Sequence, residues 1–368
     1  MSQCLKGLRV LDLTRVLAGP YCTQMLGDLG ADILKIERPF AGDDTRHWGP
    51  PFEGNADEGM SAYYLSINRN KKSVAVDIKT PEGQNIIRIL IAKSDIVIEN
   101  FKAGGLEKYG LGYKSLREDF PALIYCAISG YGQDGPLAQE PGYDFVAQGM
   151  SGLMAATGGM DQPPMKAGVA LSDIMTGMNA AIGILAALNH HHQTGRGQLV
   201  DVALTDTTLA AMTNVAQYYL TSGENAPRVG NAHSTIVPYQ AFEAADGFVI
   251  IAIGNDGQFA RFCTFIGHAD WATDERFAHN DTRVMHRDIL VPMIIDLIKT
   301  KTVAEWIEGL RSIDVPCGPV NAMDQVFDEP QIQARGMQID IDGTALVGSP
   351  LKLSETPVSY SSAPPRRG

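Results

Sequence analysis

The sequence predicts an α/β fold in which helices cover a parallel sheet, and two observations indicate it. Strand-like and helix-like segments alternate through the first hundred residues, and the composition changes after Gly223, where a smaller α+β unit begins. Alternation of this kind is typical of parallel sheets, because each crossover between parallel strands needs a long connection, usually a helix.

The first elements follow this alternation in order. Residues 8–13 and 31–37 are apolar runs typical of strands, and residues 20–30 between them form a helical pattern that ends in glycine. Further strands are expected at 73–79, 95–100, 122–132 and 198–204. The segment Thr80-Pro81-Glu82 predicts a helix start, since a hydroxyl caps well and proline fits the first turn.

The second unit has a different pattern. Residues 237–253 predict an antiparallel hairpin that turns at Asp246-Gly247. Amphipathic helices are expected at 256–267, 284–299 and 303–313. Residues 337–353 alternate again like a hairpin and must rejoin one of the two units.

Bulk properties exclude several classes of protein. The chain has 368 residues and a formal net charge of −12, which argues against nucleic-acid or anionic-membrane partners, because these need a basic face. The five cysteines are scattered with no CxxC pair, so we expect no disulfide framework and no zinc site, and a cytoplasmic location. The longest apolar stretch, Ala180–Leu188, is about half of what a membrane span requires, so we expect a soluble protein.

Asp173 carries the one formal charge between Lys166 and Arg196, in a run of small and apolar residues. A carboxylate in such surroundings needs partners that replace its lost water. In one interpretation, Asp173 caps a helix that begins near Ile174 by accepting backbone N–H groups. In the other, Asp173 is a nucleophile that the same N–H groups and the helix dipole keep anionic. Both interpretations can hold together.

Basic residues gather at the carboxyl ends of several predicted strands, where open α/β sheets bind ligands. They are Arg38, Arg46, Arg69, Lys71, Lys72, Lys102 and Lys108. Either they are solvated surface, or they bind a polyanionic cofactor such as coenzyme A. Glu37 invites a dinucleotide interpretation, but the turn after the first strand reads TRVLAGP and lacks GxGxxG, and GxxxxGK[ST] is absent from the sequence.

Two further groups have open roles. Tyr143 and Asp144 either orient an incoming acyl group or mark a loop-to-helix junction with Asp144 as its cap. His190, His191 and His192 are consecutive on a predicted helix, so their side chains diverge and we expect no metal there.

Five segments together resemble the class III coenzyme A-transferases, the family of formyl-CoA transferase and carnitine CoA-transferase. They are residues 10–39, 68–83, 95–111, 142–158 and 170–188. In that family the aspartate of the last motif forms the covalent intermediates, and it falls on Asp173. The resemblance implies an enzyme that binds acyl-CoA and a carboxylic acid as substrates, with no metal and no tightly bound cofactor.

The resemblance also implies the domain plan. A Rossmann-like large domain takes residues 1–224 together with the returning segment 326–368, and a small α+β domain takes residues 225–325. In the family two such chains form a homodimer of interlocked rings.

Position by position, the family's CoA contacts fall on Leu17, Ala18, Arg38, Val76, Lys79, Asn100, Phe101 and Lys108, with Tyr143 beside the acyl group. Formyl-CoA transferase has glutamine in place of Leu17 and a glycine run in place of residues 230–242, so formyl transfer to oxalate is not expected. Residues 42–52, 63–73 and 233–242 look more like the succinyl-CoA:glutarate CoA-transferase branch. Arg46 and His233 are the candidates to bind the distal carboxylate of a dicarboxylic acid.

An α-methylacyl-CoA racemase is the alternative function within the same superfamily. Racemases have histidine where this chain has Tyr143, and a phenol with a pKa of about 10 is a poor proton shuttle. A nucleotide-dependent oxidoreductase is a still weaker alternative, because the phosphate-binding glycines are missing.

Overall fold

The computed structural model describes residues 3–54 and 59–367, which form two compact units. The first unit contains the described residues up to Leu153, then Lys166–Thr213, and the described residues from Pro330 onward. The second unit contains Met154–Met165 and Asn214–Glu329.

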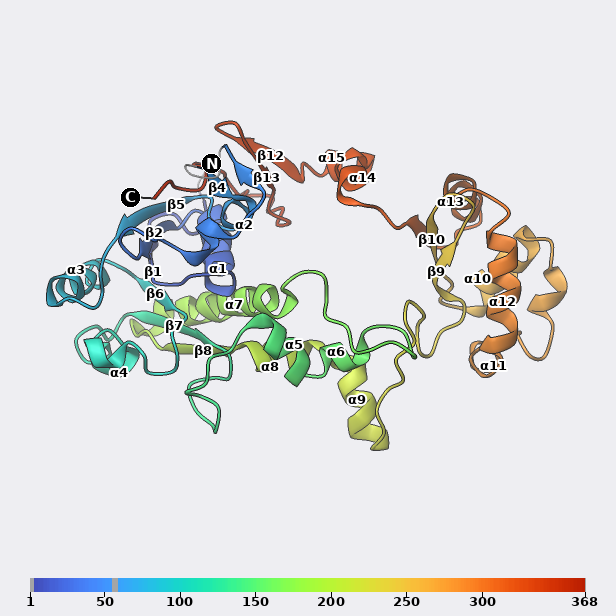
Figure 1. Ribbon diagram of the computed structural model, residues 1–368, viewed down its shortest axis with the longest axis horizontal. Coiled ribbons are helices and arrows are strands. Elements are labelled where there is room, and N and C mark those ends of the chain that lie inside the picture. The colour runs from blue at the N-terminus through green and yellow to red at the C-terminus, as the bar shows by residue number, and fades with distance from the viewer. Residues whose placement is uncertain (1–2, 55–58, 368) are drawn as a thin grey trace. The chain divides into compact units, whose positions relative to one another are not determined.

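The first unit is built on a six-stranded sheet with the strand order β5-β2-β1-β6-β7-β8, in which every pairing is parallel (Figure 1). The strands are β1 (Arg9–Asp12), β2 (Asp32–Glu37), β5 (Lys71–Ala75), β6 (Ile96–Glu99), β7 (Ile124–Ser129) and β8 (Leu199–Ala203). The predicted α/β class with a parallel sheet is therefore confirmed. The order reverses between β1 and β6, which is the switch point where doubly wound sheets bind ligands.

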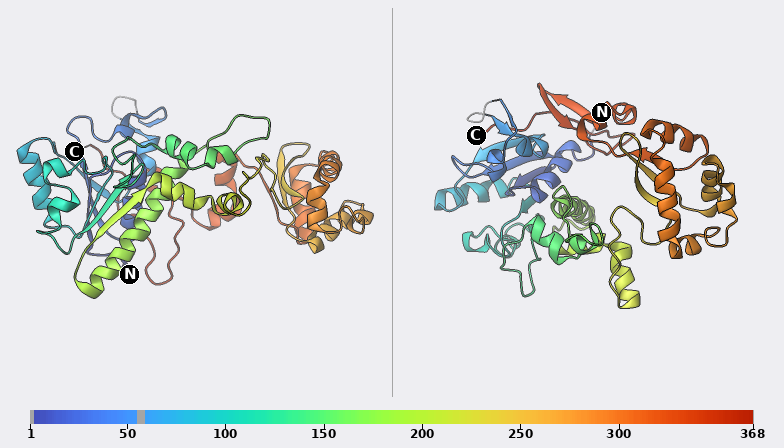
Figure 2. Two further views of the ribbon diagram at one scale, coloured as in Figure 1. Left: turned by 90° about the horizontal axis from the view of Figure 1, so that it is seen from below. Right: turned by 45° about the vertical axis from the view of Figure 1, so that its right-hand side comes forward.

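Helices cover both faces of this sheet (Figures 1 and 2). Alternate residues of β7 show it: Ile124, Cys126 and Ile128 pack with α1 (Ala18–Asp28) and α7 (Leu171–Thr194). Tyr125 and Ala127 pack on the other face with α3 (Pro81–Ile91) and α4 (Tyr113–Leu116). The two-residue period of a strand buried on both faces explains why these strands are apolar throughout.

Local signals place α3 and α7. The Thr80 hydroxyl accepts the N–H of Gly83 at 3.0 Å, and Pro81 occupies the first turn of α3, as predicted. Helix α7 ends at Gly195, which has a left-handed φ of 71° and whose N–H donates to the carbonyl of His191. At Gly177 a Cβ would lie 2.5 Å from the carbonyl oxygen of Ala18, so only glycine lets α7 approach α1 this closely.

By length and composition α7 qualifies as a candidate membrane span, with 24 residues and a mean hydropathy of 1.5. The helix extends beyond the uninterrupted apolar stretch Ala180–Leu188 on both sides. One side of helix α7 packs against α1, β7, β8 and α8 (Leu204–Ala211), as a core helix does.

The second unit is α+β. Its three-stranded antiparallel sheet has the order β11-β10-β9. Phe242, Val249, Phe259, Leu290 and Trp306 are buried in its core. The strands are β9 (Tyr239–Glu243), β10 (Phe248–Ala252) and β11 (Cys317–Pro319), and the helices around them include α10 (Asp256–Phe265), α11 (Asn280–Met285), α12 (Arg287–Ile298) and α13 (Val303–Ser312). The helix expected over 284–299 is wrong at its start, because the backbone leaves α-helical geometry at His286, with φ −108° and ψ 24°.

The hairpin expected near 337–353 is formed by β12 (Gln338–Ile341) and β13 (Thr344–Val347) in the first unit. Arg69 holds it, since its Nη1 donates to the carbonyl of Val347 at 2.8 Å. The remaining elements are β3 (Phe52–Glu53), β4 (Met60–Ser61), α2 (Ala62–Ser66), α5 (Asp144–Met150), α6 (Leu153–Ala156), α9 (Thr213–Ser222), α14 (Met323–Asp328), α15 (Pro330–Ala334) and three short 3₁₀ turns at Asp44–His47, Glu107–Tyr109 and Ala269–Ala272.

Candidate active site

A cavity of about 800 Å³ lies in the first unit at the carboxyl ends of the sheet strands. Segments that follow all six strands line it, beginning with residues 13–18 after β1 and ending with Leu204 after β8. Doubly wound sheets bind ligands at this edge, so the fold itself marks the cavity as the candidate active site.

Most of the residues singled out in the sequence line this one cavity. They are Leu17, Ala18, Arg38, Val76, Lys79, Asn100, Phe101, Lys108, Tyr143 and Asp173. Arg46, Asp144 and His233 are not among its lining residues. Segments as far apart in the sequence as Leu17 and Asp173 therefore meet at one site.

Cationic side chains line part of the wall. Lys79, Lys102 and Lys108 lie there together with Arg15 and Arg38. Arg15 and Arg38 both pair with Asp44, and the side chain of Arg38 is 52% exposed. Exposed ammonium and guanidinium groups in the lining of a cavity suit the phosphates of a polyanionic ligand.

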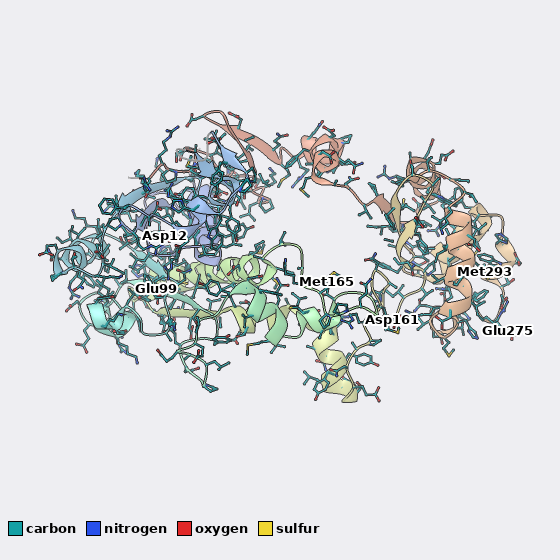
Figure 3. The ribbon with its side chains drawn as sticks, viewed as in Figure 1. Asp12, Glu99, Asp161, Met165, Glu275 and Met293 are labelled. Atoms are coloured by element: carbon teal, nitrogen blue, oxygen red, sulfur yellow. The ribbon has the colours of Figure 1, made fainter. Side chains whose placement is uncertain are left out.

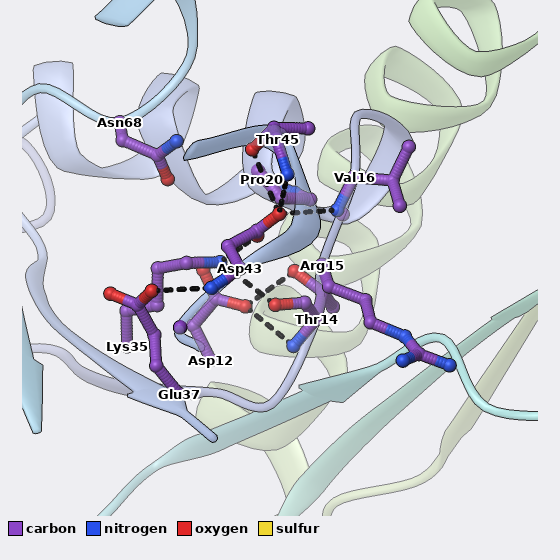
Figure 4. A network of polar contacts seen from close by, with 12 residues as sticks. Asp12, Thr14, Arg15, Val16, Pro20, Lys35, Glu37, Asp43, Thr45 and Asn68 are labelled. Carbon is purple, nitrogen blue, oxygen red and sulfur yellow. Dashed lines mark hydrogen bonds and ion pairs between the residues drawn. The ribbon is translucent and has the colours of Figure 1, made fainter. Parts of the chain in front are cut away.

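Buried charges hold the loop between β1 and α1, which forms part of the wall (Figure 4). Val16 in this loop has a left-handed φ of 71°, and its N–H donates to Asp43 at 3.3 Å. Lys35 binds both the carbonyl of Thr14 at 2.8 Å and the Asp43 carboxylate at 2.9 Å. These contacts maintain a backbone conformation that a β-branched residue otherwise avoids.

The same network contains further buried charges. Burial alone would raise the pKa of Asp12, but Lys35 and Lys71 outweigh it and the pKa is lowered. Burial lowers the pKa of Lys71 to about 7, although its Nζ donates to Pro20 and Asn68 and lies 3.5 Å from Asp12. The cluster of Arg69, Lys71 and Lys72 is therefore not a cofactor site: Arg69 and Lys71 form buried ion pairs, and Lys72 pairs with Asp32 at the surface.

Asn100 and Phe101 are held by contacts of their own. The Asn100 amide donates to the carbonyl of Arg15 at 2.7 Å and accepts its N–H at 3.0 Å, which ties the loop after β6 to the loop after β1. Glu99 (labelled in Figure 3), which sequence reasoning missed, is buried and accepts the N–H of Phe101 at 2.6 Å. Burial raises the pKa of Glu99 to about 8. Its position at the end of an apolar strand was the available signal.

Arg46 does not fit the role predicted for it. Its Nε and Nη2 donate to the two carboxylate oxygens of Glu37 at 2.8 and 2.6 Å, and Nη2 also contacts the Tyr64 hydroxyl and the carbonyl of Pro365. The guanidinium is buried and already neutralised, so we do not carry Arg46 forward as a ligand for a substrate carboxylate. His233 lies in the second unit, where its ring packs edge-on against Tyr239 and its Nδ1 accepts the N–H of Thr235.

Asp173 lies in the first turn of α7, which begins at Leu171 rather than near Ile174. The predicted cap is wrong: the N-cap is Ala170, and the N–H groups of Ser172 and Asp173 donate to Oδ1 of Asp144, at 2.8 and 3.3 Å. Across the described part of the chain, no residue donates a hydrogen bond to the Asp173 carboxylate and no cation pairs with it. Burial, with the charge of Asp144 as a smaller cause, raises the pKa of Asp173 to about 7.

Two tyrosines lie around this carboxylate. Tyr143 lines the cavity, and 63% of it is exposed, so its phenol is open to a ligand. Burial and the charges of Asp173 and Asp144 raise the pKa of Tyr63 to about 12. Tyr63, which packs edge-on against Trp48, was not singled out in the sequence, because nothing in the order of residues brings α2 near α7.

No group of three or more His, Cys, Asp or Glu side chains suited to a metal ion occurs within residues 3–54 and 59–367. A carboxylate with a raised pKa and several cationic side chains thus share a cavity at the switch point of the sheet. This combination of residues suits an enzyme that acts on an acyl group carried by a phosphorylated ligand.

The family model for CoA-transferase family III matches residues 5–368, and the chain belongs to this family of enzymes. It is 48% identical to a succinate–glutarate CoA-transferase of Agrobacterium fabrum, over 99% of this chain and 93% of the relative. It is 43% identical to the human succinyl-CoA:glutarate CoA-transferase, over 95% of this chain and 82% of the relative. The crystal structure of a CAIB/BAIF family protein from Brucella suis superimposes with a TM-score of 0.91 at 46% identity, covering 100% of this chain and 97% of that one. The predicted family membership is confirmed.

Proposed function

We propose that this enzyme moves coenzyme A from succinyl-CoA to a second dicarboxylic acid, glutarate first among them, with Asp173 as the covalent carrier. One observation carries the proposal: Asp173 shares its cavity with Lys79, Lys102 and Lys108, so one site offers both a nucleophile and phosphate-binding cations. The two relatives named for succinate or succinyl-CoA and glutarate supply the choice of acids.

The reaction starts when a carboxylate oxygen of Asp173 attacks the thioester carbonyl of succinyl-CoA. The C–S bond breaks, which leaves an aspartyl–succinyl anhydride and free CoA thiolate. The thiolate then attacks the aspartyl carbonyl, so succinate departs with the bridging oxygen and Asp173 carries a CoA thioester.

The second half runs the same steps in reverse. A glutarate carboxylate attacks the aspartyl carbonyl and expels the thiolate, which forms an aspartyl–glutaryl anhydride. The thiolate attacks the glutaryl carbonyl, glutaryl-CoA forms, and the Asp173 carboxylate is regenerated. One thioester is consumed and one is made, so the overall reaction requires no other energy source.

The lack of hydrogen bonds to Asp173 supports this role. A carboxylate that several donors stabilise is a weak nucleophile, whereas one with few partners keeps its basicity. The N–H groups of Ser172 and Asp173 already donate to Asp144, so they are not free to stabilise the oxyanion of each step.

The proposed assembly is an interlocked homodimer in the cytoplasm, with the large domain as 1–224 and 326–368 and the small domain as 225–325. An apolar surface supports a self-association face: Met178, Ile182 and Leu185 are exposed along α7, and Phe145 and Met150 along α5. These residues are large and cluster on two elements that pack together.

The test is an exchange assay that follows new CoA esters by mass spectrometry. Wild-type protein with succinyl-CoA is expected to convert glutarate, and to convert shorter and longer dicarboxylates more slowly. Asp173→Ala is expected to be inactive. Turnover by Asp173→Ala, or α-proton exchange without a second acid, would contradict the proposal.

A further inference from the structure

We propose that Asp144 is a positioning residue for the nucleophile: it fixes the first turn of α7 and keeps the Asp173 carboxylate poorly stabilised until it is acylated. This inference rests on the proposed function, because it takes Asp173 as the covalent carrier. It is carried by the hydrogen bonds at the start of α7, where Asp144 accepts the backbone N–H of Asp173 itself, and by the negative charge that Asp144 brings close to Asp173.

Asp144 takes up the donors that would otherwise stabilise Asp173. The first N–H groups of a helix have no partner within the helix. In α7 the N–H of Leu171 donates to the carbonyl of Val169 at 2.8 Å, and those of Ser172 and Asp173 donate to Asp144. The helix start is thus saturated by groups other than the side chain of Asp173.

Gln148 holds Asp144 in place. It is fully buried, and its Nε2 donates to Oδ2 of Asp144 at 2.8 Å. Its Oε1 accepts the N–H of Ala167 at 2.9 Å, so the same amide fixes the segment that leads into α7. Both carboxylate oxygens of Asp144 are engaged, which leaves a rigid acid beside the nucleophile.

Charged and titratable side chains on neighbouring elements could affect the pKa of Asp173. Tyr21 on α1 and Tyr63 on α2 both have raised pKa values, so both are neutral. Two further acids lie on neighbouring elements, Asp206 on α8 and Asp201 on β8, and neither contributes to the pKa shift of Asp173. Of the surrounding charges, that of Asp144 is the one that raises the pKa of Asp173.

The negative charge of Asp144 affects the free energy of Asp173 differently before and after acylation. Free Asp173 carries a negative charge that Asp144 opposes, whereas the anhydride and the thioester of Asp173 are neutral. Acylation therefore removes the repulsion, so Asp144 raises the free energy of the resting carboxylate more than that of the covalent intermediates.

The decisive variant is Asp144→Asn, which keeps an acceptor oxygen for α7 and removes the charge. We expect the acidic limb of the kcat/KM profile to move at least half a pH unit lower, because kcat/KM reports the ionisation of the free enzyme. We also expect the fraction of enzyme trapped as the Asp173 thioester, measured by mass spectrometry after acid quench, to fall severalfold. Asp144→Ser, whose hydroxyl also caps, serves if the asparagine variant misfolds.

Controls separate positioning from general damage. Asp32→Asn removes an exposed carboxylate that pairs with Lys72, and is expected to leave both readouts unchanged. Asp144→Ala removes the acceptor as well as the charge. It is expected to have a lower kcat than Asp144→Asn, because the first turn of α7 is then no longer fixed. A wild-type pH profile and wild-type trapping in Asp144→Asn would overturn the inference.

A spectroscopic titration keeps this inference distinct from the proposed function. The ionisation of Asp173 is followed by ¹³C NMR of labelled protein, and its midpoint is expected to fall in Asp144→Asn. If that midpoint falls while wild-type enzyme forms no Asp173 adduct, the proposed function fails and the electrostatic link between the two residues stands. If the midpoint is unmoved, Asp144 does not tune the nucleophile.

Discussion

At the scale of single residues, the surroundings of Asp173 destabilise its ionised carboxylate. Asp173 is partly buried beside another acid, and that acid accepts the N–H groups of Ser172 and Asp173 in the same helix turn. The Asp173 pKa of about 7 in the folded protein lies above the ordinary aspartate value of 3.8, so the ionised form costs the folded protein stability. Strained or destabilised groups of this kind are typical of active sites, where they serve the reaction.

Because the charge of Asp173 is destabilised, we predict that Asp173→Asn stabilises the protein while it abolishes CoA transfer. Between pH 4 and 7 the folded state binds more protons than the unfolded state, so wild-type stability falls as pH rises through that window. At pH 8 we expect the variant to gain on the order of 1–3 kcal/mol over wild type, and little at pH 4. Urea unfolding at the two pH values measures it; a variant less stable than wild type at pH 8 would contradict it.

The sequence was informative about which acid matters, and less so about how it is held. Asp173 stands out because it is alone in an apolar run, whereas its partner Asp144 lies in a distant segment. Local pattern suggested that Asp173 caps its own helix, since a side chain at a helix start commonly does. A cap supplied by another helix depends on tertiary packing, which no local pattern records.

At the scale of elements, the walls of the cavity depend on close packing and on buried ion pairs beneath the loops. Helices α1 and α7 meet where Gly177 faces the backbone of Ala18. Lys35, Asp43 and Asp12 meet under the loop between β1 and α1 (Figure 4). Each contact joins a strand or helix to a segment that lines the site.

Gly177→Ala is expected to force α7 away from α1 and to move both Asp173 and Ala18. Overpacking of this kind costs about 1–3 kcal/mol, and we expect kcat to fall more than tenfold. Gly168→Ala is the matched control, because a Cβ there meets nothing within 4 Å. Thermal unfolding and the exchange assay measure the two effects; wild-type kcat in Gly177→Ala would show that the close approach is dispensable.

Asp12→Asn is expected to destabilise the first unit by about 3–5 kcal/mol at pH 7, because it leaves Lys71 and Lys35 short of a buried partner. The loss is expected to be smaller at pH 9. Because burial lowers the pKa of Lys71 to about 7, this lysine is neutral at pH 9 with or without Asp12, so at that pH the substitution leaves no charge on Lys71 unpaired. Urea unfolding at both pH values is the measurement, with Lys72→Gln, at the surface, as a control of small effect. An equal loss at both pH values would argue against the pairing.

Strand and helix patterns could be predicted well where they were local. The six strands of the parallel sheet, the cap at Thr80 and the glycine after α7 all follow from short-range periodicity and turn chemistry. The basic residues could not be sorted in this way. Arg69 and Lys71 look like Lys79 and Lys108 in the sequence, and only the fold places the first pair in buried ion pairs and the second on the cavity wall.

At the scale of the whole molecule, a strongly acidic chain places several cationic side chains around one cavity. The formal net charge is −12, yet Lys79, Lys102 and Lys108 line the cavity together with two arginines. An apolar surface on α7 and α5 is a second large-scale feature, and we assign it to the proposed dimer.

The apolar surface predicts the behaviour of one charge substitution. Ile182, which is 64% exposed on α7, is expected to lie within the dimer, so Ile182→Glu shifts the protein toward monomer. Ile86→Glu on α3 makes the same change at a residue that is 46% exposed, and is expected to leave the assembly intact. Sedimentation velocity compares them; identical profiles for the two variants would remove this surface from the interface.

The most direct test of the covalent role of Asp173 follows oxygen atoms. The enzyme turns over succinyl-CoA with glutarate labelled with ¹⁸O in its carboxylates, and the peptide that contains Asp173 is weighed by mass spectrometry. If the glutarate oxygen bridges the anhydride and stays with the enzyme when glutaryl-CoA leaves, the Asp173 carboxylate acquires ¹⁸O and passes it to succinate in the next turnover. Turnover with no label in Asp173 or in succinate would contradict the covalent mechanism.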